Sequence, residues 1–178
     1  MTKTKVTAPY GTWPSPITAG MIADTTISLS SVLVDGGDIY WLEGRPSEGG
    51  RVVLVRWTDA GPVDVLPQGY SARTRVHEYG GGAAIVSDGA VFFVNFEDQR
   101  IYRLDNGGKP EAITADSGDR HADMVHDEVR QRILCVRERH TGDGVINELI
   151  AVDLASGASK ILVGGHDFVS NPRVSPDR

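Results

Sequence analysis

The densest group of chemically capable side chains lies in one segment, Arg73-Thr74-Arg75-Val76-His77-Glu78-Tyr79-Gly80-Gly81-Gly82. It combines two guanidinium groups, an imidazole, a carboxylate and a phenol with three glycines, which allow the backbone to approach a ligand or a neighbouring segment closely. Such a segment has the groups needed to bind a charged ligand or to face another domain. The alternative is purely structural: Arg75 and Glu78 pair locally, and the glycines serve only close packing.

The recognised metal and phosphate motifs do not fit this segment. His77-Glu78 begins like the H-E-x-x-H motif of zinc peptidases, but Gly81 stands where the second histidine is required. The three glycines lack the lysine and the spacing of a phosphate-binding loop. We therefore expect neither a metal nor a cofactor here.

Two other histidines, His121 and His126, lie among the acidic residues Asp119, Asp123 and Asp127. A spacing of five residues between the histidines suits neither one face of a helix nor one face of a strand, and a metal centre needs converging ligands. The pattern predicts solvated turn residues rather than a metal site.

A catalytic nucleophile is not evident in the sequence. No serine stands in a G-x-S-x-G context, which marks the nucleophile of α/β-hydrolases. Cys135 lies in the apolar run Ile133–Val136 and is predicted to be a small buried hydrophobic residue. No catalytic residue is predicted, and the 178-residue chain alone is expected to be inactive.

The elements that must position the loop are short strands separated by glycine and aspartate turns. A unit of four strands recurs along the chain, and its fourth strand begins at Pro62, Pro110 and Ala158, an interval of 48 residues. Four strands repeating every 40 to 50 residues or so is typical of β-propeller blades, whereas a β-sandwich is the alternative all-β fold. No helix of about 12 residues has the required apolar periodicity.

The repeat predicts an all-β, partial β-propeller with about three four-stranded antiparallel blades and the first strand of a fourth. We expect a lead-in segment at residues 1–26 and an incomplete propeller at 27–178. The blades are expected at 27–67, 83–115 and 122–164, and the next blade is expected to start at 169–178. Three blades leave apolar faces open, so possible self-association through these faces is expected.

Composition excludes some classes of protein. The chain has 18 basic and 24 acidic residues and a formal net charge of −6, so no basic surface for nucleic acid is expected. The N-terminal residues hold no apolar stretch typical of a signal peptide, and no run of about 18 apolar residues suits a membrane span. With a single cysteine, which cannot form an internal disulfide, these features favour a cytoplasmic protein.

Several segments resemble the prolyl oligopeptidase family of serine peptidases, and more narrowly its dipeptidyl aminopeptidase and acylaminoacyl peptidase branch. They are the stretch from Pro9 to Ile17, the His-Glu-Tyr-Gly-Gly-Gly segment at 77–82, the run 134–138, and Asn171–Asp177. Two departures stand out: His121 occupies a position where the family favours an aromatic residue, and the chain ends Pro-Asp-Arg rather than Pro-Asp-Gly.

The resemblance implies an N-terminal propeller that gates access to a C-terminal α/β-hydrolase domain, and this hydrolase domain is absent from the chain. A complete relative would hydrolyse short peptides or aminoacyl amides with a Ser-Asp-His triad. The resemblance places a substrate entrance or domain interface at Arg73, Arg75, His77, Glu78, Tyr79, Gly80, Gly81 and Gly82, with Trp13 along the same interface.

Two other functions remain open from the sequence. One is a stand-alone propeller module for binding, completed by self-association or by another chain. The other is a small propeller enzyme that uses a metal in its channel, which the lack of a ligand cluster in the sequence disfavours.

Overall fold

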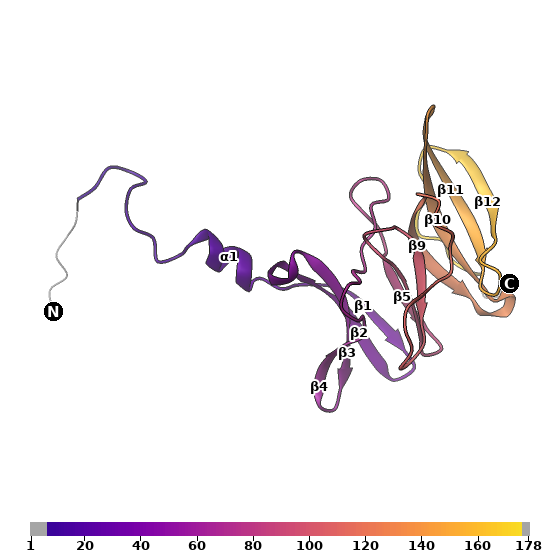
Figure 1. Cartoon of the computed structure of the whole chain (residues 1–178), viewed down its shortest axis with the longest axis horizontal. Helices are drawn as coiled ribbons and strands as arrows, with labels where there is room; N and C mark the ends of the chain where they lie inside the picture. The colour runs from indigo at the N-terminus through magenta and orange to yellow at the C-terminus, as the bar shows by residue number, and fades with distance from the viewer. Residues whose placement is uncertain (1–6, 176–178) are drawn as a thin grey trace.

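The computed structural model describes residues 7–175, which form three four-stranded antiparallel sheets that follow one another in chain order (Figure 1). The first sheet contains β1 (Ser28–Asp35), β2 (Asp38–Arg45), β3 (Arg51–Thr58) and β4 (Gly61–Asp64). The second contains β5 (Ala84–Ser87), β6 (Ala90–Val94), β7 (Ile101–Leu104) and β8 (Glu111–Ala112). The third contains β9 (Arg120–Asp127), β10 (Arg132–Thr141), β11 (Gly144–Asp153) and β12 (Ser159–His166).

The strand order within each sheet equals the sequence order, as the repeat predicted. The sheets do not close into a ring, so the predicted all-β, partial β-propeller with three four-stranded blades is confirmed. We refer to the three sheets as blades 1, 2 and 3.

The tight two-residue turn between the first two strands recurs in blades 1 and 2 for a physical reason, whereas the corresponding connection in blade 3 is longer. In blade 2 the turn residues Asp88 and Gly89 have φ of 52° and 74°, the conformation that a two-residue hairpin with the right twist requires. In blade 1 the Asp35 carboxylate accepts a hydrogen bond of 2.6 Å from the Gly89 amide. The first turn of one blade is thus bonded to the first turn of the next.

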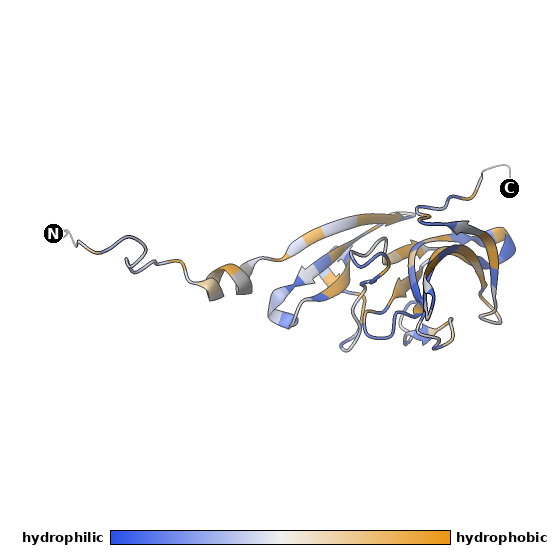
Figure 2. Cartoon of the chain, turned by 90° about the horizontal axis from the view of Figure 1, so that it is seen from above, coloured by the Kyte–Doolittle hydropathy of each residue, from blue (hydrophilic) through white to orange (hydrophobic). Residues whose placement is uncertain are grey.

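Blade 2 is buried on both faces, because successive side chains of a strand point to opposite sides. Val91 and Phe93 of β6 belong to the apolar core between blades 1 and 2. Phe92 and Val94 belong to the core between blades 2 and 3. Figure 2 shows the apolar residues concentrated on the strands, which hold both cores.

The outer face of blade 1 has no such cover. Its apolar residues are exposed: Leu29, Val32, Val34, Ile39 and Trp57. Beyond it, an N-terminal arm extends away from the sheets and carries one short helix, α1 (Ala19–Thr25), at the end of the molecule opposite blade 3 (Figure 1).

The structure adds detail that the pattern did not predict. Helix α1 is too short for apolar periodicity to reveal, and Thr18 caps it by accepting a hydrogen bond from the Met21 amide. Strand β8 has only two residues, because the Thr114 hydroxyl, rather than a backbone carbonyl, accepts the hydrogen bond of the Ile101 amide. Two short 3₁₀ turns, η1 (Pro46–Glu48) and η2 (Glu128–Arg130), connect strands.

The strand expected to start a fourth blade is not formed in the described residues. Residues 169–175 pair with no strand, and a strand needs a neighbour to satisfy its backbone groups. Pro176, Asp177 and Arg178 lie outside the described residues, so the start of a further blade stays a prediction. No helix within residues 7–175 is long and apolar enough to span a membrane.

Candidate functional site

The segment from Arg73 to Gly82, which we call the 73–82 loop, connects blades 1 and 2 and lies against blade 3. Its first half is fixed by buried hydrogen bonds. The Thr74 hydroxyl donates to the His121 carbonyl at 2.6 Å, and the Arg75 amide donates to Gln99 Oε1 at 2.7 Å. Val76 is buried in a small apolar cluster with Ala122 and Val136.

The two arginines of the loop share one aromatic partner. The guanidinium carbons of Arg73 and Arg75 lie 4.7 and 4.3 Å from the ring centre of Phe96, a cation–π arrangement. Arg75 therefore does not form the local pair with Glu78 that the structural alternative predicted, because among the ion pairs of residues 7–175 Glu78 pairs with Arg120.

The centre of the loop holds two residues in an unusual backbone conformation. His77 and Glu78 have φ of 56° and 65°, in the left-handed region that non-glycine residues rarely adopt. Such residues persist only where their surroundings impose the conformation, and they gather at functional sites. The His77 amide donates to Glu138 Oε2 on β10 at 2.6 Å.

Two of the three glycines, Gly81 and Gly82, allow the loop to lie flat on β9, whereas Gly80 has a φ of 91° and approaches the Thr74 carbonyl. A Cβ atom on Gly81 would lie 3.0 Å from the Ala122 Cβ, and one on Gly82 would lie 3.1 Å from an Asp123 carboxylate oxygen. The Gly82 amide donates to that oxygen at 2.6 Å, and the Asp123 amide returns a bond to the Gly82 carbonyl at 2.8 Å. Close backbone approach is thus the structural reason for the glycines.

Glu78 is held by a guanidinium from blade 3. Arg120 Nη1 on β9 lies 2.6 Å from Glu78 Oε1 and 3.0 Å from Glu138 Oε1. The hydrogen bond and the positive charge of Arg120 hold the pKa of the Glu78 carboxyl below its usual value. The Glu78 side chain is 75% exposed, so it presents a negative charge to solvent beside the loop.

The same cluster contains residue types that bind metal ions. Glu78, Glu138 and His140 offer one ligand atom each within 4.8 Å of one another. Arg120, however, already donates to both carboxylates and supplies the positive charge that a metal ion would bring. A metal ion would have to displace Arg120, so the arrangement is better described as an ion-pair network.

A cavity of about 640 Å³ opens beside this network. Its wall includes the loop residues His77 and Glu78, and Glu138, Asn147 and Phe168 from blade 3 and the segment after it. Two buried atoms in its wall lack a hydrogen-bond partner among the described residues: His77 Nε2 and Asn147 Oδ1. Buried polar atoms are normally paired, so these two are exceptions among the residues that line the cavity.

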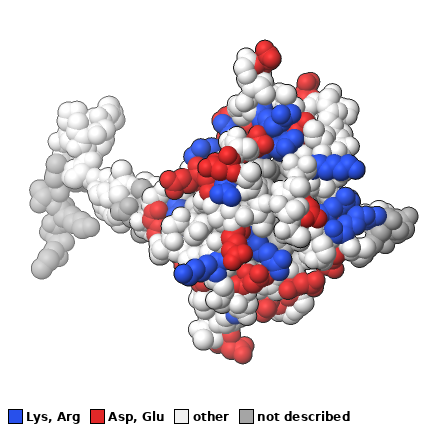
Figure 3. Space-filling model, turned by 45° about the vertical axis from the view of Figure 1, so that its right-hand side comes forward, with Lys and Arg blue, Asp and Glu red and all other residues white. Residues whose placement is uncertain are grey.

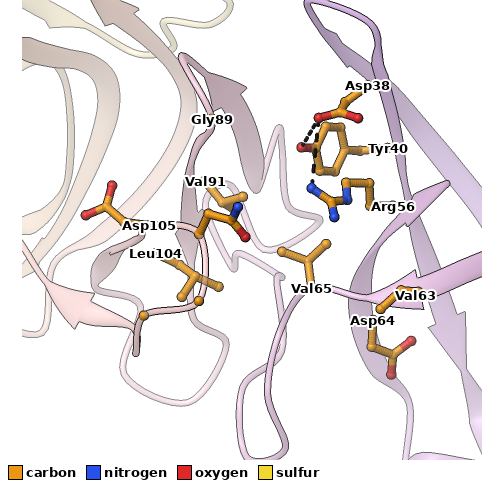
Figure 4. Close-up of a pocket in the computed structure, with 13 residues that line it drawn as sticks. Asp38, Tyr40, Arg56, Val63, Asp64, Val65, Gly89, Val91, Leu104 and Asp105 are labelled. Atoms are coloured by element: carbon orange, nitrogen blue, oxygen red, sulfur yellow. Dashed lines mark hydrogen bonds and ion pairs between the residues drawn. The ribbon is translucent and has the colours of Figure 1, made fainter. Parts of the chain in front are cut away.

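A second cavity of about 360 Å³ lies between blades 1 and 2. Figure 4 shows Asp38, Tyr40 and Arg56 on its wall; Arg56 and Asp38 are 3.9 Å apart. Its floor is apolar, with Val65, Val91 and Leu104. It contains none of the residues of the 73–82 loop.

The structure does not bring all the predicted site residues together. Trp13 lies in the N-terminal arm, where its ring meets Tyr10 edge to face, with ring centres 6.0 Å apart. The arm and blade 3 lie at opposite ends of the molecule in Figure 1. A shared interface of Trp13 with the 73–82 loop therefore stays a prediction. Tyr79 is exposed at the outer side of the loop and contacts the His77 ring.

The histidines and aspartates around β9 are not the solvated turn residues that we predicted. His121 is 3% exposed and its Nδ1 lies 2.9 Å from the Gln99 carbonyl, while Asp127 is 2% exposed and binds Arg130 and Arg132. The error arose because β9 runs through this segment and contains a bulge at Asp123, whose φ is 53°. The bulge breaks the two-residue alternation on which the prediction relied.

Sequence reasoning missed Arg120, Glu138 and His140 as members of the site. Glu138 and Arg120 are directly opposite each other on β10 and β9, and Glu138 faces Asn147 on β11. A charged residue at an inward position of an apolar strand was the available signal. The prediction that Cys135 is a small buried residue is confirmed: Cys135 is fully buried, and burial raises the pKa of its thiol to about 12.

Charge over the molecule is mixed. Figure 3 shows acidic and basic side chains interspersed on the face in view. Ion-pair groups of the structure include Arg45 with Glu43, Glu48 and Asp64. This face therefore has no extended patch of one charge sign that would attract a strongly charged partner.

Neither a protein-family model nor a curated protein matches the sequence. Solved structures do match it. A puromycin-hydrolysing peptidase of Mycobacterium tuberculosis is 35% identical, with a TM-score of 0.84 over 97% of this chain. A puromycin hydrolase is 34% identical, with a TM-score of 0.84 over 96% of this chain. The chain spans 30% of the length of each of these proteins. Together with the three open blades, this similarity shows that the chain matches a propeller region of peptidases of the prolyl oligopeptidase family, consistent with the N-terminal propeller that the sequence predicted.

Proposed function

We propose that this chain is the propeller portion of a serine peptidase that hydrolyses short peptides or aminoacyl amides. The observation that carries the proposal is that nearly the whole chain matches two peptidases that act on puromycin, and that the match spans less than a third of the length of each. Puromycin is an aminoacyl amide, which agrees with the dipeptidyl aminopeptidase and acylaminoacyl peptidase branch. The catalytic triad belongs, in this proposal, to an α/β-hydrolase domain beyond the chain.

The propeller's part in this activity is to gate access and to contribute contacts at the substrate entrance. The 73–82 loop supports this role through its two left-handed residues and its exposed Glu78 charge beside a cavity. The division into a lead-in at 1–26 and a propeller from 27 belongs to the same proposal, as do peptide substrates, the hydrolase domain as partner and a cytoplasmic location.

The test compares two glutamate-to-alanine changes in the full-length protein. Glu78→Ala removes a charge at the cavity, whereas Glu111→Ala removes an exposed charge on β8. We expect kcat/KM for aminoacyl chromogenic amides to fall at least about tenfold for Glu78→Ala, the size of one charge-assisted hydrogen bond, and to stay within about twofold for Glu111→Ala. Equal values for the two variants would remove the role of the loop.

A separate assay tests the proposal that the catalytic triad lies outside this chain. The 178-residue chain by itself should show no hydrolysis of the same amides. Turnover that persists through repeated purification would overturn the proposal that the catalytic residues lie elsewhere.

A second candidate function is a binding module completed by self-association or by another chain. The exposed apolar face of blade 1 favours it, because soluble proteins rarely expose a contiguous apolar surface without a partner. The reading frame beyond Arg178 distinguishes the two: a downstream G-x-S-x-G supports the peptidase, and its absence supports the module.

A further inference from the structure

We infer that the buried Glu138 is a positioning residue that fixes the 73–82 loop and, through Arg120, the direction of the Glu78 carboxylate. Only one consequence of this inference, an effect of Glu138 on the KM of the peptidase, rests on the proposed function. The positioning itself is a property of the propeller and is tested separately below.

Glu138 lies where a carboxylate is costly unless its oxygens are used. It is 2% exposed, and burial of a charge without partners is strongly unfavourable. Three donors compensate it: the His77 amide at 2.6 Å on Oε2, and Arg120 Nη1 at 3.0 Å and His140 Nε2 at 2.7 Å on Oε1. One oxygen thus binds the loop backbone, and the other binds the side chain that holds Glu78.

The loop needs such a partner because its own conformation is unfavourable. His77 and Glu78 are two consecutive non-glycine residues in the left-handed region, and such residues keep this conformation only where contacts with their surroundings compensate its cost. Within the loop, two short-range backbone bonds span the turn: the Glu78 amide donates to the Arg75 carbonyl and the Gly80 amide donates to the Val76 carbonyl, both at 2.9 Å. The bond to Glu138 is the link from the His77 amide to another blade.

The register of blade 3 places Glu138 at this point. Arg120, Glu138, Asn147 and His166 are paired in turn from β9 to β12, so they form one row across the sheet. Arg120 Nη1 in this row also donates to the Arg75 carbonyl at 3.0 Å. Two members of this row therefore contact the loop. Arg120 binds the Arg75 carbonyl and the Glu78 carboxylate, and Glu138 binds the His77 amide.

Glu138→Gln tests the inference with little change in shape. A carboxamide keeps one acceptor oxygen, so the variant must place an N–H group against either the His77 amide or the Arg120 guanidinium. We expect hydrogen exchange of the His77 and Glu78 amides, followed by NMR, to become at least about fivefold faster, equivalent to about 1 kcal/mol of lost protection.

Glu148→Gln is the matched control. Glu148 is another buried glutamate of blade 3, but its partners are Arg137 and Arg139, away from the loop. It should leave the exchange of His77 and Glu78 unchanged although it removes an equivalent charge. Should Glu138→Gln fail to fold, Arg120→Gln removes the second half of the link, and it should speed exchange at Glu78.

Exchange rates of His77 and Glu78 that stay within about twofold of wild type in Glu138→Gln or in Arg120→Gln would overturn the inference. Kinetics of the full-length protein then separate it from the proposed function. We expect both Glu78→Gln and Glu138→Gln to raise KM at least about fivefold with kcat within about twofold, because the lost contact is one of binding.

The remaining outcomes are distinct. A loop loosened by Glu138→Gln without any effect of either variant on KM supports the positioning role and removes the proposed role of Glu78. A KM raised by Glu78→Gln but not by Glu138→Gln refutes the role of Glu138 in directing the Glu78 carboxylate and leaves the proposed function intact.

Discussion

Ionisable side chains buried in blade 3 are each paired with a specific partner. Glu138 binds the 73–82 loop, Glu148 binds two arginines, and Asp127 binds two more. Burial alone would raise the pKa of Glu148, but hydrogen bonds from Arg137 and Arg139 lower it overall. His121 differs, because its partner is a neutral carbonyl rather than a carboxylate. Burial therefore dominates, and it lowers the pKa of His121.

His121 makes the stability of the chain depend on pH. In the unfolded chain its pKa returns to about 6.5, so below that value the unfolded state binds more protons and stability is lost as the pH falls. The stabilising contribution is fully present above about 6.5. The neighbours Asp119, which opposes the shift, and Arg137, which adds to it, do not reverse it.

Thermal unfolding measures this effect. Between about pH 7.5 and about pH 5.5, we expect a larger drop in Tm for the wild type than for His121→Gln, which cannot titrate but can still donate to the Gln99 carbonyl. His166→Gln, at an exposed position, should retain the wild-type dependence. Identical pH profiles for the wild type and His121→Gln would show that His121 does not contribute.

At the level of elements, the loop and β9 behave as one unit. The glycines of the loop have no room for side chains where they meet Ala122 and Asp123, and the Asp123 carboxylate also accepts a bond from the Asn171 amide. β9 thereby joins the 73–82 loop to the segment that follows blade 3. The bulge at Asp123 turns that side chain toward both partners.

Gly81→Ala tests the close approach. Its Cβ would lie 3.0 Å from the Ala122 Cβ and 3.0 Å from Asp123 Oδ1, so the loop must shift from β9 at a cost of about 1–3 kcal/mol in the free energy of unfolding. Gly37→Ala is the control, since nothing lies within 4 Å of its Cβ position. Urea unfolding of the two variants gives the comparison; a Gly81 variant as stable as the Gly37 variant would contradict the prediction.

At the level of the whole molecule, three blades bury two interfaces and leave the outer face of blade 1 uncovered. Val34 and Ile39 are paired across β1 and β2 and are 65% and 47% exposed on that face. In a closed propeller each blade is covered by its neighbours. We therefore propose this uncovered face as a surface for another blade, supplied either by the same protein or by a second copy.

The isolated chain should consequently self-associate. We expect light scattering to show an average mass that rises with concentration, and Ile39→Glu to reduce this rise because it places a charge in the apolar face. Val129→Glu introduces the same charge at an exposed apolar residue of η2, outside that face, and should leave association unchanged. A monomer at all concentrations would refute the prediction.

Most of the strands, their order within each blade and the repeat were predictable from the sequence, because these depend on local signals such as the Asp88-Gly89 turn and the alternation along β6. The sequence also singled out the 73–82 loop as the candidate site, which stays a prediction. The partners of that loop became evident from the tertiary structure alone. His77 and Glu138 are 61 residues apart, and their contact depends on how blade 3 packs beside the loop and on the register of β9 with β10. Packing between blades follows from shape and burial summed over many residues, which no local pattern encodes.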